Sequence, residues 1–114
     1  MAITSDRLRS RIWVQACVRI CDLNFLPIVV VRKGDEDAGA ILLKLSRRDG
    51  VAEVLVQVRT SEGKRGWMGA AGGGEITDEA ADAYIGRQTA RDPDLWVIES
   101  QDPDGRYNPD GGIV

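Results

Sequence analysis

The first pattern along the chain is helical and covers residues 5 to about 24. Apolar side chains recur there at intervals of three and four residues, which places them on one face of a helix. That apolar face comprises Trp13, Val14, Cys17, Ile20 and Cys21. Arginines line the opposite face at steps of four, Ser5 or Asp6 can cap the start, and Pro27 prevents continuation. We therefore expect a mostly buried helix with a narrow basic stripe facing solvent.

From Pro27 onward the pattern becomes that of β-strands. Aliphatic and β-branched residues fill three segments that are separated by short polar loops. The segments are 27–33, 40–47 and 51–60, and a shorter fourth strand is expected at 67–70. The pair Asp49-Gly50 is typical of a two-residue hairpin turn with positive φ angles. Because connections this short cannot cross over between parallel strands, we expect an antiparallel meander.

A second helix is predicted over residues 77–92, after a glycine-rich segment (70–75) that we interpret as a flexible connection. Thr77 can cap this helix. Acidic residues in the first turn and arginines in the last turn suit the helix dipole. Asp92-Pro93 ends the helix, and residues 95–100 form the last strand.

The element order α-β-β-β-(β)-α-β predicts an α+β fold, in which two helices pack on an antiparallel β-meander of four to five strands. The chain has 114 residues, which suits one core rather than two. We expect a single domain over residues 1–100. Residues 101–114, rich in Asp, Pro and Gly, are expected to form a flexible tail.

Composition narrows the class of protein. No apolar run approaches the roughly 20 residues that cross a bilayer, and the first residues lack the apolar core of a signal peptide, so a cytoplasmic location is expected. Cys17 and Cys21 are interpreted as reduced core residues. A zinc site is the alternative, but the chain has no histidine and no further cysteine. Without histidine, catalysis would need carboxylates, lysine, tyrosine or a metal ion. We expect no cofactor, and we favour a non-catalytic role while enzymatic activity stays an open alternative.

The segment GDEDAG at residues 34–39 concentrates the most charge. Asp35, Glu36 and Asp37 stand together between two glycines, and Arg32 with the next lysine precedes them. The first interpretation is a solvated loop of a hairpin. The alternatives are a loop that recognises a partner and a site for Mg²⁺ or Ca²⁺, because hard cations prefer oxygen ligands. The spacing of an EF-hand calcium loop is absent.

Trp67 follows a turn, and burial in the core is the favoured interpretation, with a partly exposed interface anchor as the alternative. Basic residues could instead contact nucleic acid through the first helix and the neighbouring turns. They are Arg7, Arg11, Arg19, Arg47, Arg48, Lys64 and Arg65. A net charge of −3 and a pI near 4.9 make nucleic-acid binding the less favoured interpretation.

Two stretches carry a resemblance to a known family. RKGDEDAGA at residues 32–40 and DPDLWVIE at 92–99, together with Trp13 and Trp67, resemble a bacterial family associated with alphaproteobacteria, domain of unknown function 1491. The resemblance extends over about residues 8–100. It implies a single small domain, and the family carries no assigned activity, cofactor or catalytic residue.

The sequence thus favours a non-catalytic protein-interaction or regulatory domain, with a protein partner or self-association, including a homodimer through a sheet edge. The binding residues expected are Arg32, Asp35, Glu36, Asp37 and Trp67. One alternative is a metal-dependent hydrolase that uses the acidic loop with Glu99 or Asp94. A second alternative is weak nucleic-acid binding through the basic face of the first helix. We assign no catalytic residue, no metal site and no membrane partner.

Overall fold

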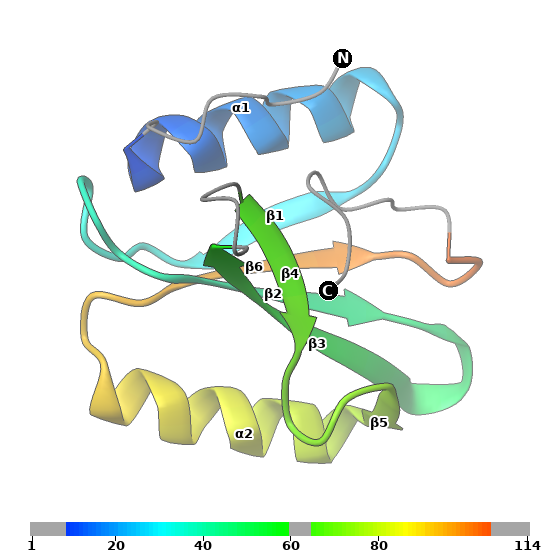
Figure 1. The fold of residues 1–114 in the computed structure, drawn as a ribbon. Helices are drawn as coiled ribbons and strands as arrows, with labels where there is room; N and C mark the ends of the chain where they lie inside the picture. The colour runs from blue at the N-terminus through cyan, green and yellow to red at the C-terminus, as the bar shows by residue number, and fades with distance from the viewer. Residues whose placement is uncertain (1–8, 60–64, 106–114) are drawn as a thin grey trace.

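The computed structural model of the protein describes residues 9–59 and 65–105. Its elements are α1 (Ser10–Leu23), β1 (Ile28–Arg32), β2 (Ile41–Ser46), the 3₁₀ turn η1 (Arg48–Gly50), β3 (Val51–Arg59), β4 (Arg65–Gly69), β5 (Glu75–Thr77), α2 (Asp78–Arg91) and β6 (Trp96–Gln101). The helices cover opposite faces of one sheet, which makes three layers (Figure 1). The predicted α+β class and element order are confirmed. Within the described ranges, neither helix is long and apolar enough to cross a membrane.

The sheet is mixed, so the prediction of a purely antiparallel meander is wrong. The strand order is β1-β6-β2-β3-β4, with β5 pairing to β3. Strand β6 enters between β1 and β2, antiparallel to β1 and parallel to β2. The loop that joins β1 to β2 therefore spans the end of β6 and is not a hairpin loop. The argument from short connections failed because it assumed that consecutive strands are neighbours.

Several local predictions are confirmed. Asp49 and Gly50 have the predicted positive φ angles, 60° and 72°, although the connection from β2 to β3 is the three-residue turn Arg48–Gly50 and not a two-residue one. Thr77 caps α2, with its Oγ1 accepting a hydrogen bond from the Ala80 N–H at 3.1 Å. The helix ends at Arg91, before the predicted stop. The glycine-rich segment is a turn followed by β5, a strand that we did not predict.

Helix α1 begins at Ser10, later than predicted, because Arg9 has an extended backbone. The two caps that we proposed, Ser5 and Asp6, lie outside the described residues. Arg9 makes no side-chain cap, and the first turn is instead capped by main-chain carbonyls of the loop after β1.

The core has two parts, one on each face of the sheet. The part under α1 is dominated by large residues and holds all three tryptophans. The part under α2 is built from smaller side chains, including Ala52, Ala70 and Ala81. Because both faces are covered, β2 is buried along its length, which explains its nearly continuous apolar sequence.

The start of the predicted tail is attached to the sheet. Strand β6 continues to Gln101, past the predicted domain boundary. Asp102 is 2% exposed and its carboxylate accepts a hydrogen bond from Arg47 at 2.8 Å. Asp104 pairs with Arg48. Residues 106–114 lie outside the described residues.

Cys17 and Cys21 are free and buried, as predicted. The hydrogen bond that the Cys21 thiol makes to Cys17, burial, and the charges of Cys17 and Asp22 raise the pKa of the Cys21 thiol far above its usual value. Because the thiolate is the reactive form and both cysteines are buried, we expect neither thiol to react with iodoacetamide in the native protein at pH 8. Mass spectrometry after alkylation measures this. Alkylation of the native protein as fast as of the urea-denatured protein would contradict it.

Candidate functional site

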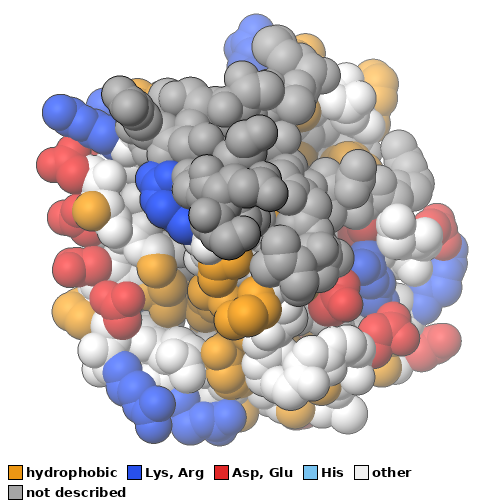
Figure 2. Space-filling model, in the orientation of Figure 1, with side chains coloured by type: hydrophobic (Ala, Val, Ile, Leu, Met, Phe, Trp, Pro, Cys, Tyr) orange, Lys and Arg blue, Asp and Glu red, His pale blue; other side chains and the backbone are white. Residues whose placement is uncertain are grey.

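The loop at residues 33–40 closes over the beginning of β6. The Asp35 N–H donates to the Asp94 carbonyl at 2.9 Å, and the Trp96 N–H donates to the Ala40 carbonyl at 2.8 Å. The Trp96 indole Nε1–H donates to the Asp35 carbonyl at 2.7 Å. The two stretches that carried the family resemblance are therefore hydrogen-bonded to each other. Figure 2 shows acidic side chains gathered on the side of the molecule where this loop lies in Figure 1.

The same loop supplies the N-terminal cap of α1. The Ser10 N–H donates to the Asp37 carbonyl at 3.3 Å, and the Arg11 N–H donates to the Glu36 carbonyl at 3.0 Å. The Ser10 hydroxyl donates to the Gly39 carbonyl at 2.6 Å. These bonds satisfy backbone donors that a helix leaves unpaired in its first turn. The main chain of the loop thus joins α1, β1, β2 and β6.

The three acidic side chains of the loop have separate partners. Asp35 Oδ2 accepts from the backbone N–H groups of Asp37 and Ala38 at 3.1 and 2.9 Å. Glu36 pairs with Lys33 at 3.2 Å. The Asp37 carboxylate lies 3.4 Å from an Arg9 nitrogen. Across the part of the chain that the structure describes, no group of three or more acidic or cysteine side chains is arranged to hold a metal ion.

The remaining predicted site residues, Arg32 and Trp67, form no ion pair with these three carboxylates among the described contacts. Arg32 Nη2 donates to the Pro93 carbonyl at 3.0 Å, so this arginine joins the same two loops. Trp67 is fully buried, with its ring 5.6 Å from that of Trp13. The structure therefore places Trp67 in the core, as the favoured interpretation had it, and not at the surface as an anchor. The hydrolase alternative used Glu99 or Asp94. The Glu99 side chain faces Lys44 and not the acidic loop, whereas Asp94 contacts the loop through its main-chain carbonyl.

Lys44 is a buried charged side chain that the sequence analysis did not single out. It lies in the middle of β2 and is 4% exposed. Its Nζ is 2.7 Å from Asp78 and 2.8 Å from Asp82 on α2, and 3.8 Å from Glu99 on β6. Burial lowers the pKa of Lys44, but the hydrogen bonds to the two aspartates and the nearby carboxylate charges outweigh it and raise the pKa above 10.5. The only sequence signal was one lysine within an apolar strand.

An apolar surface remains at the edge of the sheet. We define the β1 edge surface as four exposed apolar residues at the end of α1, in the turn that follows it and on β1. Its members are Leu23 (62% exposed), Phe25 (88%), Val29 (58%) and Val31 (57%). Among the described strands, β1 pairs only with β6, so its other side is a free edge. A bulge between Val30 and Arg32 interrupts the pairing with β6.

Phe25 holds an unusual backbone position. The Leu26 N–H donates to the Cys21 carbonyl at 2.9 Å, and the Phe25 N–H donates to the Asp22 carbonyl at 3.2 Å. These two bonds form a Schellman motif at the end of α1. Phe25 occupies its left-handed position with a φ of 58°, where glycine is preferred. A large aromatic side chain is therefore presented to solvent at the expense of backbone strain.

A family model described as a protein of unknown function, DUF1491, matches residues 8–108. The chain belongs to the DUF1491 family. This confirms the resemblance seen in residues 32–40 and 92–99. A search of curated proteins gave no match.

Solved structures of DUF1491 proteins and a related protein share this fold. A crystal structure of a DUF1491 family protein from Caulobacter crescentus CB15 has a TM-score of 0.79 and 36% identity, covering 95% of this chain and 98% of that chain. An NMR structure of a DUF1491 protein from the same organism has a TM-score of 0.77 and 36% identity, covering 95% and 97%. The solution structure of protein Atu0922 from A. tumefaciens has a TM-score of 0.72 and 26% identity, covering 86% and 88%.

The family assignment brings no activity with it, so the two alternative functions stay predictions. Two of the basic residues proposed for nucleic-acid binding have acidic partners, because Arg47 pairs with Glu53 and Asp102, and Arg48 with Asp104. Titration calorimetry with Mg²⁺, Mn²⁺ or Ca²⁺ remains the test of the metal-dependent hydrolase.

Proposed function

We propose that this protein is a non-catalytic interaction domain of the cytoplasm that self-associates through the β1 edge surface. The observation that carries the proposal is Phe25, an 88% exposed aromatic residue held at a left-handed backbone position. A non-glycine residue in this conformation costs on the order of 1 kcal/mol. The fold of one copy gains little from such a side chain, whereas an interface gains from a large aromatic anchor. The two buried, free thiols agree with a reducing compartment.

The edge of β1 supports the same proposal. Edge strands in monomeric proteins are usually protected by charged residues, prolines or bulges, because their free N–H and C=O groups pair with other strands. Strand β1 has a bulge, but Val29 and Val31 remain 58% and 57% exposed on it. These valines offer apolar contacts beside the free backbone groups, which favours addition of a strand from another chain.

A second copy of the chain is the partner that this surface fits. Two copies of β1 can pair antiparallel about a twofold axis, since each presents the same edge to the other. That arrangement brings the Phe25 end of each strand to the Arg32–Lys33 end of its partner. An aromatic ring then lies beside basic side chains, and this contact is attractive.

The test compares two lysine substitutions at the two edges of the sheet. Val31→Lys places a charge on the free edge of β1. Met68→Lys is the matched control, because Met68 is 47% exposed on β4 at the opposite end of the sheet. We expect the wild-type protein and Met68→Lys to dimerise in sedimentation equilibrium, and Val31→Lys to dimerise at least about tenfold more weakly.

Phe25→Gly separates the interface from the stability of the fold. We expect this substitution to weaken dimerisation while it stabilises the monomer by about 1 kcal/mol, because glycine adopts the left-handed conformation without strain. Urea denaturation of dilute protein measures the second effect. A wild-type protein that stays monomeric from about 1 μM to about 1 mM, or equal weakening by Val31→Lys and Met68→Lys, would refute the proposal.

A further inference from the structure

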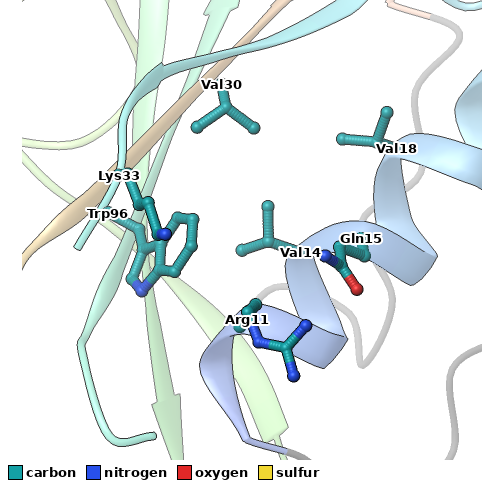
Figure 3. A pocket seen from close by; sticks show the side chains of 7 residues that line it. All are labelled: Arg11, Val14, Gln15, Val18, Val30, Lys33 and Trp96. Atoms are coloured by element: carbon teal, nitrogen blue, oxygen red, sulfur yellow. The ribbon is translucent and has the colours of Figure 1, made fainter. Parts of the chain in front are cut away.

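A cavity of about 410 Å³ lies between α1 and β1, next to the loop that closes over β6 (Figure 3). Its lining residues come from α1, from β1 and the residue after it, and from β6. They are Arg11, Val14, Gln15, Val18, Val30, Lys33 and Trp96. The volume lies within the range of small-molecule sites, roughly 300–1,000 Å³. We propose that this cavity binds a small organic carboxylate with an apolar body. The proposal does not depend on self-association through β1.

The apolar side chains that line the cavity indicate that the ligand has an apolar body. Val14 is 2% exposed and Trp96 is 4% exposed, and Val18 and Val30 complete an apolar surface. Val30 pairs with Ile98, whose side chain is fully buried, yet Val30 itself is 43% exposed. Helix α1 therefore leaves the edge of the sheet partly uncovered here. An aliphatic or aromatic group of a ligand would remove this apolar surface from water.

The polar groups at the cavity determine the charge of the ligand. Among the residues that the structure describes, two cations, Arg11 and Lys33, and one amide, Gln15, line it, and none of the lining residues is acidic. Within the described residues, the Arg11 guanidinium has no ion-pair or hydrogen-bond partner, whereas Lys33 pairs with Glu36 in an exposed contact. A guanidinium binds a carboxylate through two parallel hydrogen bonds. Figure 3 shows Arg11 and Gln15 on α1, with Val30 on β1 and Lys33 directly after it, across from this helix.

The cavity is formed before any ligand arrives. The Trp96 indole is held by its hydrogen bond to the Asp35 carbonyl at 2.7 Å, and the backbone of Arg11 by its bond to the Glu36 carbonyl at 3.0 Å. Both anchors belong to the same loop, so the apolar wall and the backbone that carries Arg11 keep a constant relative position. A site that is already ordered loses less conformational entropy when it binds.

The test uses 4-phenylbutyrate as the probe and its neutral amide, 4-phenylbutyramide, as the matched ligand. The readout is the NMR signal of the Trp96 indole N–H in the full-length protein. We expect 4-phenylbutyrate to shift this signal saturably, and the amide to bind at least about tenfold more weakly. Arg11→Gln should reduce the affinity for the acid to that for the amide. Arg19→Gln, two turns along the same helix, should leave both affinities unchanged.

Three results would overturn the proposal. The first is the absence of a saturable shift of the Trp96 indole signal up to about 10 mM of either probe. Any affinity would then be weaker than that of ordinary small-molecule sites. The second is equal affinity for the acid and the amide, which would show that the cations do not recognise the carboxylate. The third is an equal loss with Arg11→Gln and Arg19→Gln, which would indicate general attraction by surface charge. The backbone NMR spectra of both variants establish that they fold. If the protein binds the acid but does not dimerise, this proposal stands and the proposed function is wrong.

Discussion

Gly39→Ala is expected to destabilise the fold by about 3 kcal/mol, the upper part of the usual range for overpacking. A Cβ atom at this position would meet the Asp94 carbonyl oxygen well inside the 3.0 Å that real Cβ atoms keep, and would lie 2.9 Å from Trp96 Cδ1. Neither of these two groups can move freely. The Asp94 carbonyl accepts from Asp35, and the Trp96 ring is fixed by its own hydrogen bond. Urea denaturation of the two proteins measures the difference.

Gly86→Ala is the matched control for this substitution. Gly86 lies in α2, and a Cβ atom there would meet nothing within 4 Å. Alanine is the better helix former, so this variant should gain about 1 kcal/mol. Opposite signs for the same chemical change would identify close backbone contact as the cause at Gly39. A Gly39→Ala protein as stable as the wild type would show that the loop and β6 can move apart.

Lys44→Met is expected to cost about 2 kcal/mol at neutral pH. Removing one partner of a buried ion pair usually costs roughly 3–5 kcal/mol, and the partly exposed aspartates of this cluster reduce the figure because water screens them. Asp78 and Asp82 are 43% and 63% exposed, and Glu99 is 24% exposed. Methionine fills a similar volume, so the expected loss comes mainly from three carboxylates that no longer share a cation.

Lys33→Met makes the same chemical change at an exposed ion pair and serves as the control. Lys33 is 63% exposed, so its substitution should cost no more than about 0.5 kcal/mol. The pH dependence gives a second readout. The pKa of Lys44 is raised in the folded state, so its ion pairs contribute fully below the unfolded value of 10.5. The contribution is then lost as the pH rises through the folded-state pKa.

Denaturation at several pH values therefore separates the two variants. The difference between wild type and Lys44→Met should stay constant from about pH 7 to about pH 9 and narrow in stronger alkali. Equal losses for Lys44→Met and Lys33→Met would mean that the buried cluster adds nothing beyond a surface pair.

The predictions that held are those that rest on neighbouring residues. Periodicity identified both helices, Asp49-Gly50 marked the turn, and Thr77 marked the start of α2. Each of these features depends on hydrogen bonds and side-chain spacing within a few residues, so the local sequence contains the necessary information.

The candidate site was predicted in position but not in chemistry. The segment at 34–39 attracted attention because of its acidic side chains, yet its firmest contacts are made by main-chain groups that cap α1 and hold β6. Main-chain contacts leave little trace in side-chain composition. The glycines at both ends were the relevant signal, because only glycine allows the backbone of residues 94–96 to approach so closely.

The sequence alone established the α+β class, the element order, the family and the buried cysteines. The tertiary structure was needed to reveal that β6 inserts between β1 and β2, that Lys44 meets three carboxylates, that Trp67 is core and that a cavity lies beside Trp96. The physical reason is that strand order depends on how all elements together bury both faces of the sheet. Contacts between residues 30 to 70 positions apart follow from that order, and no local pattern encodes them.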